Sequence, residues 1–183
     1  MDLPKTFTFP NRTQWRAWLQ AHHAEAAEAW LLIAKVKTPG LHLAAAVEEA
    51  LCFGWIDGVM KPLDEKHYLL RFSPRTPQSI WSLSNIQRVE ALTAAGKMTG
   101  AGLAKVREAQ ENGEWEAALR RERVDEIPPE LEAALEGIPG GLSAYRAARA
   151  SQKKQWIYWL QTAKRAETRE RRIQKIIEAL MGG

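Results

Sequence analysis

The stretch that decides the fold spans residues 54–73 and reads GWIDGVMKPLDEKHYLLRFS. Residues 54–61 and 67–73 flank a polar turn, a pattern typical of a β-hairpin. With Asp64 at the centre, paired residues have numbers that sum to 128. This register gathers the side chains of a predicted core face on one side of the hairpin: Ile56, Met60, Tyr68, Leu70 and Phe72.

The other face of the predicted hairpin carries the more informative polar residues. It comprises Trp55, Asp57, Val59, Leu69, Arg71 and Ser73. Asp57 then lies directly across from Arg71, although aspartate is disfavoured in strands. Two interpretations stay open. The pair is a structural ion pair covered by Trp55, or the face is a polar pocket in which Arg71 or Arg75 receives an anionic group bidentately.

Outward from the hairpin, the first half of the chain mixes helix and strand patterns, and the second half is helical. We expect a helix capped by Asn11 or Thr13, a strand over residues 29–36 and a helix over residues 43–53. Helices are then expected over residues 82–95 and 101–112, and two more begin at residue 115 and after residue 128. The last three expected helices span residues 143–150, 151–164 and 167–181. The predicted fold class is α+β, a small antiparallel sheet packed with helices. We expect a single domain, residues 1–183, with a mixed α+β part (1–115) and a helical part (116–183).

Composition excludes several classes of protein. The chain has 183 residues, a formal net charge of +4, eight tryptophans and one cysteine. A single cysteine excludes a disulfide framework. The first residues lack the apolar run of a secretory signal, and no stretch is apolar enough for a transmembrane segment. We therefore expect a cytoplasmic protein.

No catalytic residue, cofactor or metal site is predicted. The four histidines are scattered, and none belongs to a metal-binding spacing. Cys52 lies between apolar neighbours on a predicted helix, which indicates an inert core thiol. The glycines of residues 96–102 match neither a phosphate loop nor a dinucleotide fingerprint, so we interpret this segment as a helix-to-helix turn.

The last predicted helix is basic. Arg165, Arg169 and Arg172 are spaced so that they share one face, opposite an isoleucine and leucine stripe. This face could hold nucleic acid or an acidic membrane surface, but a solvated face is the commoner case. Aromatic residues do not alternate with these arginines as a base-stacking platform requires, so we do not expect nucleic acid as a partner.

Several segments together resemble one known family. They are EEALCFGWIDG (48–58), RFSPR (71–75) with SIWS (79–82), GKMT (96–99) with AGL (101–103), and Trp156-Ile157 with AKRAETRERRI (163–173). In this order they are similar to the YdeI/OmpD-associated, or bacteriocin-protection, family, from about Trp30 to Leu180. The resemblance implies a single α+β domain with a helical C-terminal portion. It brings no established reaction.

The resemblance implies a stress or antimicrobial-peptide protection protein, and we expect it to act by binding rather than as an enzyme. The partner is then an unknown anionic ligand or a protein. The family name also refers to an outer-membrane porin, but no export signal is visible, so no porin partner is carried over. The alternative is an anion-binding protein or enzyme in which Arg71 and Arg75 clamp the anion and Asp57 is a base. The candidate ligand-binding residues are Trp55, Asp57, Arg71, Arg75, Trp81, Lys164, Arg165 and Arg169.

Overall fold

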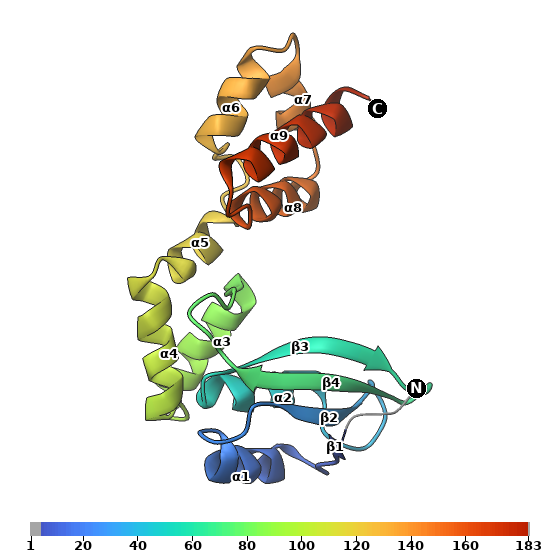
Figure 1. The fold of residues 1–183 in the computed structure, drawn as a ribbon. Coiled ribbons are helices and arrows are strands. Elements are labelled where there is room, and N and C mark those ends of the chain that lie inside the picture. Colours follow the sequence, from blue (N-terminus) through green and yellow to red (C-terminus); the bar gives the residue numbers. More distant parts are fainter. Residues whose placement is uncertain (1–4, 183) are drawn as a thin grey trace. The chain divides into compact units, whose positions relative to one another are not determined.

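The computed structural model describes residues 5–182, which form two compact units (Figure 1). The first unit ends at Trp115 and the second begins at Glu116. The α+β class with a helical second half is confirmed, since every described strand precedes residue 75.

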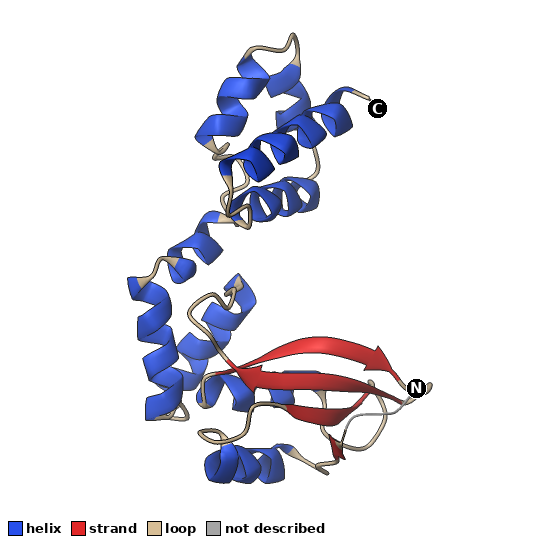
Figure 2. Cartoon of the chain, in the orientation of Figure 1, coloured by secondary structure: helices blue, strands red, loops and turns tan. Residues whose placement is uncertain are grey.

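The first unit is built on a four-stranded sheet with the order β1-β2-β4-β3 (Figure 2). The strands are β1 (Thr6–Phe7), β2 (Ala29–Ala34), β3 (Trp55–Pro62) and β4 (His67–Pro74). β2, β4 and β3 pair antiparallel as expected, but β1 pairs parallel with β2. The sheet is therefore mixed rather than antiparallel. β1 was not predicted, because two residues are too few to show an alternating pattern.

Helices α1 (Arg12–His22) and α2 (Leu43–Cys52) pack on one face of this sheet. The fully buried Trp15 of α1 lies against Trp55 and Phe72, with ring centroids 6.4 and 5.7 Å apart. Its indole Nε1 donates to the carbonyl of Ala46 at 3.0 Å, which ties α1 to α2.

Charged groups add a second connection between α1 and α2. Glu49 is only 3% exposed, yet its carboxylate contacts Arg12 and Arg16 at 2.6 and 2.8 Å. These contacts raise the pKa of both arginines, against the opposing effect of burial. A buried carboxylate is stable in this position because it has two cationic partners.

Helices α3 (Leu83–Ala94) and α4 (Gly100–Glu111) complete the first unit. Residues 96–99 form the helix-to-helix turn that the sequence predicts. Thr99 caps α4, and both its backbone N–H (3.1 Å) and its hydroxyl (2.6 Å) donate to the carbonyl of Cys52. A Cβ on Gly102 would lie 2.3 Å from the same oxygen, so only glycine allows α4 to approach α2 this closely. The Cys52 side chain is buried, as predicted.

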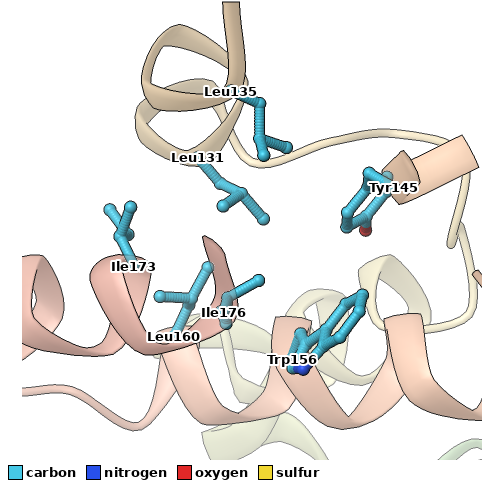
Figure 3. Close-up of a cluster of buried hydrophobic side chains, with 7 residues drawn as sticks. All are labelled: Leu131, Leu135, Tyr145, Trp156, Leu160, Ile173 and Ile176. Carbon is cyan, nitrogen blue, oxygen red and sulfur yellow. The ribbon is translucent and has the colours of Figure 1, made fainter. Parts of the chain in front are cut away.

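The second unit is a small helical assembly. α5 (Glu114–Arg120) crosses the boundary, and α6 (Pro129–Glu136), α7 (Gly141–Ala147), α8 (Ala150–Gln161) and α9 (Ala166–Met181) follow. Its core is the cluster drawn in Figure 3: Leu131, Leu135, Tyr145, Trp156, Leu160, Ile173 and Ile176.

Two details of the second unit differ from prediction. α7 begins at Gly141 rather than at residue 143, and α8 begins at Ala150 rather than at residue 151. Within residues 5–182, no helix is both long and apolar enough to cross a membrane.

Candidate functional site

The β3–β4 hairpin has a different register from the predicted one. Asp57 lies opposite Phe72, and Met60 lies opposite Leu70. The paired numbers therefore sum to 129 near Asp57 and to 130 near the turn, rather than to 128. Asp57 does not face Arg71, and the predicted cross-strand ion pair between them is wrong.

The turn and a bulge explain the difference. The Asp64 carboxylate accepts the backbone N–H groups of Lys66 (2.7 Å) and His67 (2.6 Å), which lowers the pKa of Asp64, and the turn centres on Glu65. Between the Asp57 and Met60 pairs, β3 contains one residue more than β4, which is a β-bulge.

Because side chains alternate along a strand, the new register redistributes the two faces. Trp55 and Asp57 share a face with Phe72, on the side that packs against α1. Ile56, which was predicted for the core face, lies on the opposite side. Tyr68, Leu70 and Phe72 do share one face, as predicted.

Arg71 lies on the face away from α1, within a polar and aromatic cluster. Its guanidinium contacts the Glu28 carboxylate at 3.6 Å, and the other Glu28 oxygen accepts a bond from the Trp30 indole at 3.1 Å. The Lys61 ammonium lies 4.9 Å from the centre of the Trp30 ring. Arg71 is thus an ion-paired, half-exposed residue that can meet a partner at the surface. Sequence reasoning missed Glu28, Trp30 and Lys61, because the cluster depends on two strand pairings: β2–β4, which places Trp30 opposite Arg71, and β3–β4, which brings in Lys61.

Trp55 belongs to the core of the first unit. It is 1% exposed, and its indole donates to the carbonyl of His23 at 3.2 Å. Its ring meets Trp15 and Trp18 edge-on, at 6.4 and 5.9 Å. A side chain enclosed in this way positions β3 against α1 and offers no free surface to a ligand.

Arg75 is the most unusual of the candidate residues. It follows β4 directly, and only 3% of it is exposed. The guanidinium lies over the buried ring of Trp81, 3.8 Å from its centre, in a cation–π arrangement. One nitrogen, Nη1, donates to the carbonyl of Ile80 at 3.3 Å. The other two, Nε and Nη2, are inaccessible to solvent and have no hydrogen-bond partner among the described residues.

Burial dominates the electrostatics of Arg75. It lowers the pKa of the guanidinium to about 10, and the nearby negative charge of Asp57 partly opposes this effect. Asp57 is half-buried and forms no ion pair with Arg75 within 4 Å. Arg75 nevertheless stays protonated at neutral pH, so it can bind an anion but cannot act as a general base.

The three C-terminal candidates belong to the second unit. Lys164 and Arg165 are exposed, at the start of α9. Arg169 donates to the carbonyl of Leu160 at 3.3 Å and contacts Glu130. Arg172, on the same face, donates to the carbonyl of Trp159 and, at 2.9 Å, to the hydroxyl of Thr162.

These contacts give the basic face of α9 a structural role. Arg169 and Arg172 satisfy carbonyl groups at the C-terminal end of α8, where cations also complement the helix dipole. The prediction of a solvated face therefore holds for Lys164 and Arg165 but not for these two arginines. The eight candidates are divided between the two units, with five in the first and three in the second.

The comparisons with known proteins assign a different family model to each unit. Residues 7–105 match a domain of unknown function, DUF8412. Residues 126–183 match the family described as bacteriocin-protection, YdeI or OmpD-associated. The predicted family is thus confirmed over the second unit, whereas the resemblance was expected from about Trp30 onward. Neither a curated protein nor a solved structure matches the chain.

Proposed function

Because the chain belongs to the DUF8412 family and its second unit matches the bacteriocin-protection family, we propose that it protects cells against bacteriocins or antimicrobial peptides by binding rather than by catalysis. The proposal assigns ligand binding to the first unit, in the region of Arg75, Trp81 and Asp57. We also propose that the protein is cytoplasmic, as the sequence predicts. Cell fractionation tests this location.

One observation carries the binding part of this proposal. Arg75 is a buried cation with two unused donor nitrogens. Folded proteins rarely leave a buried charged group without partners, because its desolvation is costly. The unused donors of Arg75 therefore favour a role in binding a ligand over a purely structural role in the core.

The enzyme alternative has less support. It needs Asp57 and the two arginines to face one another, with Asp57 as the base. Asp57 instead lies opposite Phe72, and Arg71 is on the other side of the sheet with Glu28 as its partner. The nucleic-acid alternative needs free arginines on α9, whereas Arg169 and Arg172 are engaged at the end of α8.

Deletion of the gene tests the proposed function. The deletion strain should be killed by bacteriocins and cationic peptides at lower concentrations than its parent, and the full chain supplied from a plasmid should restore survival. Equal sensitivity of the deletion strain and its parent would contradict the proposal.

A further inference from the structure

The unused donors of Arg75 have a defined geometry. A guanidinium is planar, and Nε and one N–H of Nη2 lie along one edge, pointing in the same direction. This pair forms the fork that binds a carboxylate or phosphate through two parallel hydrogen bonds. In Arg75 this edge is the unpartnered one, while Nη1 on the other edge already donates to Ile80.

The surroundings fix the orientation of that fork. The ring of Trp81 covers one face of the guanidinium at 3.8 Å, and the bond to Ile80 prevents rotation in the plane. Side-chain entropy is therefore already lost before a ligand arrives, which favours binding. Arg71 offers no such arrangement, since its guanidinium is partly exposed and ion-paired with Glu28.

We propose, on the basis of the proposed function, that the Nε–Nη2 edge of Arg75 is a binding site for one carboxylate or phosphate group of a ligand. The anion accepts one hydrogen bond from each of Nε and Nη2, so that all three guanidinium nitrogens of Arg75 then have a hydrogen-bond partner.

Because Nε and Nη2 are inaccessible to solvent, an anion can reach them only if the structure around Arg75 moves, and we expect the short loop that follows Arg75 to be the part that moves. Thr76, Pro77 and Gln78 are exposed, and the loop is closed on itself by a bond from the backbone N–H of Thr76 to the hydroxyl of Ser79 at 2.9 Å. A bond from the Asn112 side chain to the carbonyl of Pro77, at 2.9 Å, ties the loop to the end of α4. Loss of this bond should let an anion reach Arg75 faster.

Thermal unfolding of the purified full chain with inorganic phosphate or acetate, at an ionic strength held constant with chloride, tests the site. A ligand that binds only the folded state raises the unfolding temperature. We expect phosphate or acetate to do so for the wild-type protein and for Arg71→Met, a matched arginine control. Arg75→Met should lose the response, and Arg75→Lys, which keeps the charge without the fork, should bind at least ten-fold more weakly. The stronger of the two probes identifies the ligand class.

Equal responses of the wild-type protein and Arg75→Met would overturn the inference, since they indicate an adventitious ion only. If Arg75→Met does not fold, Asn112→Ala provides the second measurement. It should bind the more effective probe with a faster association rate in stopped-flow tryptophan fluorescence, and an unchanged rate would contradict the loop's role. These measurements use purified protein and are independent of the deletion strain. Anion binding at Arg75 can be absent although the deletion strain is sensitised, and it can be present although the deletion strain is as resistant as its parent.

Discussion

Replacing Gly102 by alanine tests how the first unit is held together. The added Cβ would lie 2.3 Å from the carbonyl oxygen of Cys52, whereas real Cβ atoms essentially never approach another atom within 3.0 Å. α4 must therefore move away from α2 by about 0.7 Å. This movement also strains the two hydrogen bonds from Thr99 to the same oxygen.

The expected cost follows from these contacts. Overpacking costs about 1–3 kcal/mol, and weakening two hydrogen bonds costs about 1 kcal/mol each. The better helix propensity of alanine returns up to about 1 kcal/mol. We expect Gly102→Ala to lower the free energy of unfolding of the first unit by about 2–4 kcal/mol.

Urea unfolding followed by tryptophan fluorescence measures this loss, because six of the eight tryptophans lie in the first unit. The midpoint should fall by about 1–2 M urea. Gly100→Ala is the matched control, since a Cβ there meets nothing within 4 Å, and its midpoint should stay close to that of the wild type. Equal midpoints for the two variants would refute the proposed close packing of α4 on α2.

Four further predictions concern buried polar groups. Glu49→Gln should destabilise the first unit by about 2–4 kcal/mol, as measured by urea unfolding, because Arg16 loses its ionic partner and Arg12 keeps only Glu48. Arg75→Met should be as stable as the wild type or more stable by about 1–4 kcal/mol in the same assay; a marked loss would show that Nε and Nη2 have internal partners in addition to the Ile80 and Trp81 contacts of the guanidinium. Arg172→Met should lower the thermal stability of the second unit by about 1–2 kcal/mol, followed by calorimetry, because the Trp159 carbonyl and the Thr162 hydroxyl at the end of α8 lose a donor. Burial raises the pKa of Tyr145 to about 12, so folding favours its neutral form, and stability present below pH 10 should fall as the pH rises towards 12. Tyr145→Phe should reduce this alkaline loss of melting temperature, whereas the exposed control Tyr158→Phe should not.

Local chemistry made much of the fold predictable. Asn11, Ser82 and Thr99 each accept a backbone N–H at the start of a helix, and these caps are visible in the sequence because they depend on neighbouring residues. Gly54, Gly96 and Gly113 follow the ends of helices with positive φ angles, a conformation that glycine adopts readily. The helical second half follows from the same kind of pattern.

The hairpin register could not be predicted in the same way. The alternation of apolar residues favoured a regular pairing centred on Asp64. In the structure the Asp64 carboxylate accepts a backbone N–H within the turn, the turn centres on Glu65, and the bulge adds one residue to β3. Gly58 lies in this bulge. Because Gly58 is exposed and has no side chain, the pattern of apolar residues does not indicate where the bulge is. One extra residue is enough to exchange the faces of Asp57 and Ile56.

The candidate site was only partly predictable for a related reason. Arg75 and Trp81 were selected from the sequence, but burial of the guanidinium depends on the turn at residues 76–79, which folds the chain back on itself. The roles of Arg169 and Arg172 depend on the end of α8, a contact that helical spacing on α9 does not reveal.

Survival of the deletion strain carrying different forms of the protein tests the account most directly. Arg75→Met should accumulate to the wild-type level, as measured by immunoblotting, but fail to restore survival in the presence of the bacteriocin or antimicrobial peptide that kills the deletion strain. Arg71→Met, expressed at the same level, should restore it. Full protection by Arg75→Met would contradict the claim that this protein protects by binding through Arg75.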